Sequence, residues 1–150
     1  QTTNTYFYYY NDIIAYKISA EGQFDWIKKV RKYQVSQNDG GPYSSYESFV
    51  DDGKIYFIFN DNAKNYSESG DFIDNDFLYT ANYSKRRNAV AIANIDLKTG
   101  VISRKTFFDR SEVEALAMPK LFDVNYEYGN LLLYTVWGRK EKIGVLKFKD

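Results

Sequence analysis

Three aspartates, closely spaced in a polar stretch, are the residues of this sequence best suited to bind a metal ion. Asp71, Asp74 and Asp76 lie among Asn, Ser and Tyr residues. Calcium binds clustered carboxylate and carbonyl oxygens, so these aspartates are candidate ligands. The stretch lacks the glycine and the terminal glutamate of an EF-hand loop, which favours a solvated polar loop over a calcium site.

Acidic residues inside predicted strands are the candidates for catalysis. Asp25, Glu47 and Asp123 are such residues. Two carboxylates that flank a glycosidic bond can cleave it, one as the acid and the other as base or nucleophile. A carbohydrate-active enzyme is therefore one hypothesis. Its alternative is that these carboxylates lie on solvated strand faces.

A loop rich in glycine and tyrosine is the candidate ligand-binding segment. Within residues 38–46, the side chains that could contact a ligand are those of Asn38, Asp39, Tyr43 and Tyr46. Loops on a rigid scaffold often carry recognition. The other interpretation is a tight turn whose glycines serve only the backbone geometry.

The composition excludes several classes of function. The chain has no His and no Cys, so histidine-based catalysis, disulfides and cysteine-ligated metals are excluded. Its 20 basic residues equal its 20 acidic residues, which argues against nucleic-acid or anionic-membrane surfaces. The longest apolar run is too short to cross a bilayer. We therefore predict no cofactor, no nucleic-acid partner and no membrane-spanning segment, and favour a non-catalytic role.

The strand signals surround one stretch, Gly53–Asp61, with apolar residues on both faces. Phe57 points to one side of an extended strand and Ile58 to the other, so the strand has to be covered on both faces. A similar stretch recurs at 129–137. The aromatic fraction of 19% also fits strands better than helices. We expect these two strands to lie in the middle of two stacked sheets.

Turn residues divide the rest of the chain into further strands. The predicted strands are 12–19, 23–32, 44–50, 54–60, 89–96, 101–108, 120–126, 130–137 and 142–149. Residues 1–10 are expected to form an aromatic lead-in, and residues 35–43 a loop. The capping-box spacing of Ser111 and Glu114 predicts one short helix, which Pro119 would end.

The turn glycines repeat along the chain. Gly53 matches Gly129 and Gly22 matches Gly100, at intervals of 76 and 78 residues. A long polar loop lies inside these intervals, so the underlying unit is close to the roughly 40–50 residues of a propeller blade. The predicted fold class is all-β, with four-stranded antiparallel blades that form part of a β-propeller. A β-sandwich is the alternative.

The predicted organisation is one propeller-like arc. It comprises a part-blade at 1–34, a blade at 44–108 and a part-blade at 119–150. The blade contains the inserted loop 61–88, which we expect to be a flexible excursion outside the sheet, cut first by protease at Lys85–Arg87. Upstream residues of the same protein, or another protein chain, are expected to complete the propeller. A glycan is a further candidate partner.

Six segments of the chain carry distinctive motifs: Tyr8–Asp12, Asn38–Tyr46, Lys54–Asn62, Met118–Leu121, Leu132–Lys140 and Gly144–Phe148. These motifs resemble the C-terminal part of a family of uncharacterised exported proteins from Bacteroidetes. The resemblance covers nearly the whole chain. It implies a propeller-like fold and export to the periplasm, the outer-membrane surface or the medium, and it supplies no activity and no catalytic residues. We therefore favour a non-catalytic binding or scaffolding module of the cell envelope over a carbohydrate-active enzyme or a structural subunit of an envelope assembly.

Overall fold

The computed structural model describes residues 3–81, 83–84, 87–108 and 116–148 and is dominated by antiparallel strands. The strands are β1 (Phe7–Tyr10), β2 (Ile13–Ile18), β3 (Phe24–Val30), β4 (Gln34–Gln37), β5 (Glu47–Asp51), β6 (Lys54–Asn62), β7 (Asn88–Asp96), β8 (Ile102–Thr106), β9 (Leu116–Ala117), β10 (Asp123–Asn125), β11 (Asn130–Trp137) and β12 (Lys140–Lys147). Two short 3₁₀ helices, η1 (Ala63–Asn65) and η2 (Pro119–Leu121), complete the elements. None of the described helices has the length and apolarity needed to cross a membrane. The predicted all-β class is confirmed.

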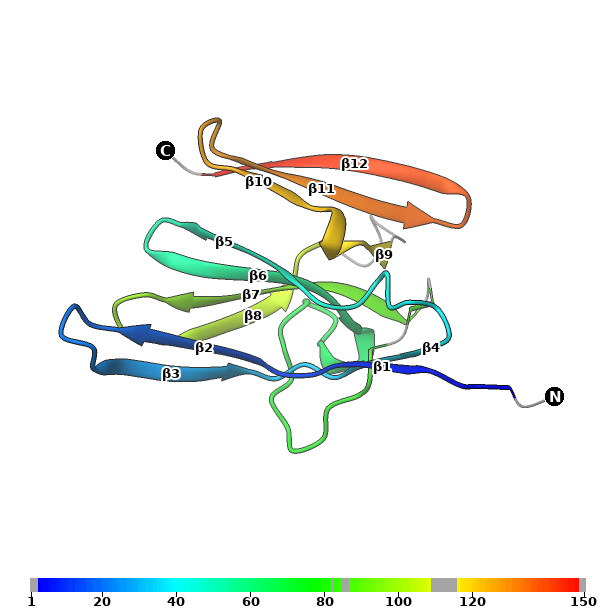
Figure 1. Cartoon of the computed structure of the whole chain (residues 1–150), viewed down its shortest axis with the longest axis horizontal. Helices are drawn as coiled ribbons and strands as arrows, with labels where there is room; N and C mark the ends of the chain where they lie inside the picture. The colour runs from blue at the N-terminus through cyan, green and yellow to red at the C-terminus, as the bar shows by residue number, and fades with distance from the viewer. Residues whose placement is uncertain (1–2, 82, 85–86, 109–115, 149–150) are drawn as a thin grey trace.

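The strands form three stacked layers that follow one another in chain order (Figure 1). The first layer holds the β2–β3 hairpin and the β1–β4 pair. The middle layer is a meander in the order β5-β6-β7-β8. The last layer has the order β10-β11-β12, and β9 also pairs with β11. None of these sheets closes on itself.

The middle layer is covered on both of its faces. Phe57 and Phe59 of β6 pack toward the first layer, where Val30 contributes to the same core. Ile58 lies between them in sequence and packs toward the last layer, together with Leu133 of β11. Phe57 is 3% exposed and Ile58 is fully buried. The prediction that this strand is covered on both faces is confirmed.

A glycine allows the first two layers to approach closely. Gly100, in the turn between β7 and β8, has φ +70°, a conformation that favours glycine. A Cβ at this position would lie only 2.8 Å from Lys28 Cε and 3.0 Å from Trp26 Cγ. The Trp26 indole N–H also donates to the Leu97 carbonyl at 3.3 Å. A side chain at residue 100 would have to displace Lys28 and Trp26, so the glycine lets the β2–β3 hairpin lie close over this turn.

The structure corrects two of the predicted boundaries. Residues 34–37 form β4, which pairs with β1, although the sequence predicted a loop from 35 and an aromatic lead-in at 1–10. Polar residues hid this strand, because Gln34 and Ser36 are its buried residues. The strand predicted at 120–126 is shortened to β10, because residues 119–121 form η2, which begins at a proline.

The inserted loop is not a free excursion over its first part. β6 continues to Asn62, and Tyr66, beyond η1, is 4% exposed. The Thr106 N–H then donates to the Gly70 carbonyl at 2.8 Å, and Asp71 forms a bridge with Lys105. These contacts cover the outer edge of β8, which a solvated loop would leave open. Lys85 and Arg86 of the predicted protease site, and the helix predicted around 111–114, lie outside the described residues.

Candidate functional site

A cluster of buried polar side chains lies where the central strand β6 ends. Asn60, Asp61 and Asn62 follow the apolar part of the strand, and all three are buried. Lys32, between β3 and β4, and Gln34, at the start of β4, are buried near them. Buried polar groups have to be hydrogen-bonded or paired, so the partners of each residue define its role. We call these five residues and Arg104 the polar cluster.

Asp61 is the acceptor at the centre of the polar cluster. Its Oδ1 accepts from the Asn62 N–H at 2.8 Å and from Asn65 Nδ2 at 2.9 Å. Its Oδ2 accepts from the Tyr66 hydroxyl at 2.8 Å and forms an ion pair with Arg104 of β8. Four donors therefore satisfy one buried carboxylate, which offsets the cost of removing its charge from water.

Arg104 lies among aromatic rings as well as polar partners. Its Nε donates to the Tyr66 hydroxyl at 2.8 Å, and another of its nitrogens donates to the Arg31 carbonyl of the first layer. The guanidinium lies 4.0 Å from the centre of the Phe72 ring, within cation–π range. Burial and the neighbouring Asp61 raise the pKa of Tyr66 well above its usual value. The Tyr66 hydroxyl therefore keeps its proton at neutral pH and donates it in the hydrogen bond to Asp61.

Lys32 is the second buried cation of the polar cluster. It is 2% exposed, and its Nζ donates to the Tyr10 carbonyl at 2.5 Å and to Gln34 Oε1 at 2.9 Å. Burial lowers the pKa of the Lys32 ammonium to about 8, against the opposing attraction of Asp61. A lysine amine with a lowered pKa is a nucleophile in many enzymes, but here the chain itself encloses it.

Asn60 connects the polar cluster to two neighbouring segments. Its Nδ2 donates to the Tyr43 carbonyl at 2.8 Å and to the Ala117 carbonyl of β9 at 2.6 Å. Its Oδ1 accepts from the Ala117 N–H at 3.1 Å. The Gln34 side chain adds a bond to the Asn60 carbonyl at 2.8 Å. One amide therefore holds the 38–46 loop and the last layer to the end of β6.

The polar cluster has the residue types of an active site, but its contacts are internal. Each of its charged groups is engaged with other groups of this chain, in positions closed to water. Such an arrangement fixes the inserted loop, the 38–46 loop and the three layers relative to one another. A substrate could bind a charged group of the polar cluster only if a buried interaction were broken. Breaking such an interaction costs several kcal/mol. We therefore assign the polar cluster a structural role.

The polar cluster has only a weak signature in the sequence. Asp61 and Arg104 are 43 residues apart, and each looks like an ordinary surface residue of a polar segment. The available signal was the polar run at 60–62 directly after a strand buried on both faces. A strand that continues into the interior has to bury whatever residues come next.

The predicted ligand loop is held by its own hydrogen bonds. Asn38, with φ +53°, accepts from the Tyr6 N–H at 2.8 Å, and Asp39 Oδ1 accepts from the Gly41 N–H at 2.8 Å. The Tyr43 ring packs against Tyr83 at a centroid distance of 5.8 Å. Tyr46 packs edge-on against the Phe57 ring and is 40% exposed. The backbone-geometry interpretation accounts for Asn38 and Asp39, and Tyr46 keeps an accessible ring.

The three aspartates of the predicted calcium site have separate contacts. Asp71 accepts from the Ser69 hydroxyl at 2.8 Å, and Asp74 pairs with Arg31 at 3.3 Å. Asp76 uses its backbone carbonyl to accept from Arg31. Among the residues that the structure describes, no three His, Cys, Asp or Glu side chains group closely enough to hold a metal ion. The structure therefore does not assemble Asp71, Asp74 and Asp76 into a metal site.

The three candidate carboxylates for glycoside cleavage belong to three different sheets. Asp25 is on β3 and pairs with Lys17 at 2.8 Å. Glu47 is on β5, where its Oε1 accepts from the Ser48 N–H at 2.8 Å, and Asp123 is exposed on β10. None of the contacts among the described residues joins two of these carboxylates.

The chain matches no protein-family model, no curated protein and no solved structure. The structural class of the chain therefore has to be taken from the arrangement of its own strands. It is a layered, antiparallel all-β module whose buried charges serve its architecture.

Proposed function

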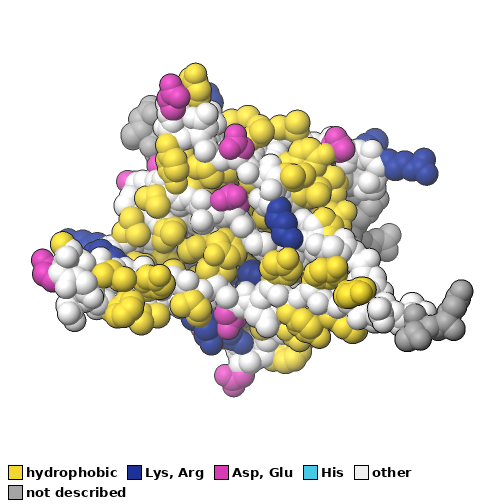
Figure 2. Space-filling model, in the orientation of Figure 1, with side chains coloured by type: hydrophobic (Ala, Val, Ile, Leu, Met, Phe, Trp, Pro, Cys, Tyr) yellow, Lys and Arg dark blue, Asp and Glu magenta, His cyan; other side chains and the backbone are white. Residues whose placement is uncertain are grey.

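We propose that this chain is part of a β-propeller-like stack and acts as a non-catalytic binding or scaffolding module of the bacterial cell envelope. The observation that carries the proposal is the exposure of apolar side chains on the outward faces of the two end layers. Exposed apolar patches of more than a few hundred Å² usually mark interaction sites. Figure 2 shows hydrophobic side chains at the surface of these layers.

On the first layer, residues alternate between a covered and an exposed face. Ile13 is buried against the middle layer, whereas its neighbour Ile14 is 57% exposed. The register pairs Tyr16 with Ile27 across the hairpin, and both are exposed. The exposed apolar residues of this outward face are Ile14, Tyr16, Ile18, Phe24 and Ile27. A soluble end layer would place polar residues at these positions.

The last layer shows the same asymmetry. Leu131 and Leu133 are buried, whereas Leu132 between them faces outward and pairs with Val145. Val145 and Ile143 of β12 are exposed. Both ends of the stack therefore expose the kind of surface that the middle layer buries.

The order of the layers supports the propeller-like part of the proposal. Successive sheets stack in chain order, and the turn glycines Gly53 and Gly129 occupy matching turns before β6 and β11. A propeller has this order, because each blade is a meander covered by its neighbours. A two-sheet sandwich accounts less well for three layers with a middle sheet covered on both faces. Export to the envelope rests on the family resemblance.

Sedimentation of the 150-residue chain over a range of concentrations tests the proposal. We expect its mean mass to rise with concentration, because the end faces bury each other. Two double variants, Tyr16→Lys with Ile27→Lys and Leu132→Lys with Val145→Lys, should reduce association. Lys29→Ala, on the first outward face, is the matched control and should not. A wild-type chain that stays monomeric at every concentration would contradict the proposal.

A further inference from the structure

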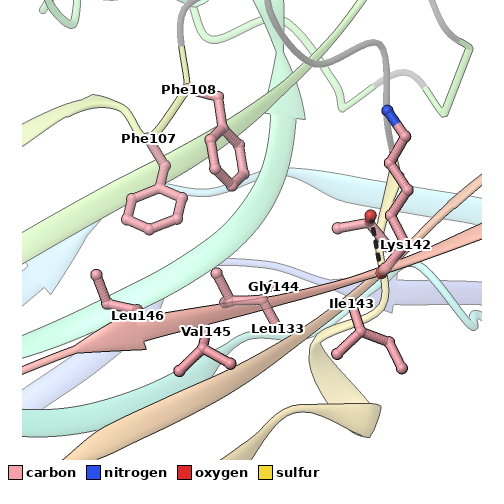
Figure 3. A pocket seen from close by; sticks show the side chains of 9 residues that line it. Phe107, Phe108, Leu133, Lys142, Ile143, Gly144, Val145 and Leu146 are labelled. Carbon is pink, nitrogen blue, oxygen red and sulfur yellow. Dashed lines mark hydrogen bonds between the residues drawn. The ribbon is translucent and has the colours of Figure 1, made fainter.

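Two of the hollows between neighbouring layers are similar in size and differ in chemistry. One, of about 330 Å³, lies between the last and middle layers, and Figure 3 shows the rings of Phe107 and Phe108 on one side of it and β12 on the other. Leu133 and Val145 add to its walls, so its lining is mainly apolar. The second, of about 320 Å³, lies between β3 and β8 and has several charged residues in its lining. We call the second one the charged hollow.

The charged hollow is built where three segments meet. Val30 of β3, Ile102 of β8 and Phe72 of the inserted loop supply its apolar walls. The Phe72 N–H donates to the Arg104 carbonyl at 3.4 Å, which holds the loop against β8. Small-molecule sites in proteins span roughly 300–1,000 Å³, so this volume lies at the lower end of their range. The charged hollow therefore has room for a small ligand whose apolar part is the size of a single ring.

Arg31 contributes a guanidinium whose orientation is already fixed. Its nitrogens donate to the Asn75 carbonyl at 2.5 Å and to the Asp76 carbonyl at 3.2 Å. The Arg31 backbone is held as well, because its carbonyl accepts from Arg104. The Arg31 side chain is nevertheless 30% exposed. A guanidinium carries several N–H donors in a rigid fork, so these bonds orient it and leave donors for an anion.

The anion that Arg31 holds in this structure is the carboxylate of Asp74. The two side chains are 3.3 Å apart, which is longer than the roughly 2.7–2.9 Å of a strong charge-assisted hydrogen bond. The Asp74 side chain is 81% exposed. Exposed ion pairs of this kind contribute little to stability, because water competes for both charges. Asp74 thus shows that Arg31 accepts a carboxylate here, and it can be replaced at little cost.

The other cations of the lining differ in how firmly they are paired. Arg104 is neutralised by Asp61 in the polar cluster, where the two side chains are 4% and 0% exposed. Lys29 has a looser partner, since its Nζ lies 3.6 Å from Asp12 Oδ2 and both side chains are accessible. Lys29 and Arg31 are therefore the cations that can exchange their partners for a ligand.

We propose that the charged hollow binds a small carboxylate ligand with an apolar body. The ligand carboxylate takes the place of Asp74 at Arg31, and Lys29 is the second cation that attracts it. The apolar body lies against Phe72 and Ile102. The inference goes beyond the proposed function, which concerns the outward faces of the end layers and does not depend on this hollow.

A titration with phenylacetate, followed by the backbone amide signals in nuclear magnetic resonance, tests the proposal. At fixed ionic strength, we expect phenylacetate to shift the signals of residues 72–74 and 102–104 and to leave those of β11 unchanged. Phenylacetamide is the uncharged analogue and should bind about ten-fold more weakly, because a hydrogen bond to a charged group is stronger than one to a neutral group. Acetate, which lacks the ring, should also bind more weakly.

A change at Asp74 separates a ligand site from a purely structural ion pair. Asp74→Asn removes the competing carboxylate, so phenylacetate should bind about two- to five-fold more tightly, the range expected for an exposed ion pair. Asp76→Asn is the matched control in the same loop, because Asp76 contacts Arg31 through its backbone carbonyl. This control should bind phenylacetate as the wild type does. Arg31→Met should remove the preference for phenylacetate over phenylacetamide, with thermal unfolding as the check that the variant is folded.

Several results would overturn the proposal. They are unchanged signals at 72–74 and 102–104, equal binding of phenylacetate and phenylacetamide, and sulfate binding as tight as that of phenylacetate. Weaker binding in Asp74→Asn, or the same gain in Asp76→Asn, would also overturn it. The proposed function is tested separately by sedimentation, because the variants used there change the outward faces and leave the lining of the charged hollow intact.

Discussion

The middle layer and the last layer contain the same kind of central strand, but only one of the two strands is buried on both faces. β6 and β11 each follow a turn glycine and carry apolar residues on both sides. Phe57 and Ile58 of β6 are both buried, whereas Leu132 of β11 is 37% exposed beside the buried Leu133. The difference lies in the neighbours. β6 has a layer on each side, and β11 has one described layer.

The polar ends of the two strands differ as well. β6 continues into Asn60, Asp61 and Asn62, which bind the inserted loop, the 38–46 loop and β9. β11 ends in a short turn to β12 at 138–139. The middle layer is thus joined to its surroundings by buried charges as well as apolar contact. The comparison teaches that one strand pattern can lie inside an enclosed core or can leave one face exposed, depending on what packs on it.

The largest expected difference between the layers is in their apolar side chains. Phe57→Ala should lower the free energy of unfolding by about 3–5 kcal/mol, the usual cost of removing a buried aromatic ring. Leu132→Ala should cost about 1 kcal/mol or less, because its outward face is already in contact with water. Denaturant unfolding of both variants checks this. Lys29→Ala is the surface control, and equal losses for Phe57 and Leu132 would abolish the distinction between the layers.

The buried ion pair should matter nearly as much as the core. Arg104→Met leaves the Asp61 carboxylate buried without its cation, so we expect a loss of about 3–5 kcal/mol in the free energy of unfolding. Lys105→Met is the matched control on the same strand, where the side chain is exposed, and should change it by about 0.5 kcal/mol or less. A small effect of Arg104→Met would mean that water reaches Asp61.

The lowered pKa of Lys32 predicts a dependence of stability on pH. The unfolded chain holds this proton up to the ordinary lysine pKa of 10.5, whereas the folded chain releases it at about 8. The unfolded state therefore binds more protons between pH 8 and 10.5, so Lys32 destabilises the fold at neutral pH and the penalty disappears as pH rises. The wild type should gain up to about 3 kcal/mol relative to Lys32→Met across this window.

Urea unfolding at several pH values measures that difference. Lys32→Met should leave Gln34 satisfied, because its Oε1 also accepts from the Ser45 N–H at 2.8 Å. The two proteins share their other titrating groups, including Tyr66, so the difference isolates Lys32. A constant difference from pH 7 to 11 would show that the ammonium remains charged in the folded chain.

The smallest expected effect concerns the contact between the first two layers. Gly100→Ala should cost about 1–2 kcal/mol, because alanine is strained at positive φ and its methyl group meets Trp26 and Lys28. Gly129→Ala is the control, since its φ is +59° but no atom lies within 4 Å of its added Cβ. Thermal unfolding should rank Gly100→Ala below Gly129→Ala. The reverse order would mean that the hairpin does not rest on the β7–β8 turn.

The sequence by itself determined the strands and their turns. Alternation of side chains and the demand for positive φ at glycines such as Gly53 and Gly129 act over a few residues, so they can be read locally. The same reasoning predicted that Phe57 and Ile58 would both be covered. It failed at β4, because Gln34 and Ser36 are polar residues whose burial depends on distant partners.

Only the tertiary structure decided which polar residues belong together. Asp61 meets Arg104, and Asn60 meets Ala117, across separations of 43 and 57 residues. The residues that neighbour these pairs in sequence do not identify them. A charged residue in a strand is exposed or buried according to which elements pack on it, and distant parts of the chain decide that. The hollow between Phe107 and β12 has the same origin. Gly144 and Phe107 are unremarkable in sequence, and both line this hollow because the last layer packs on the middle layer.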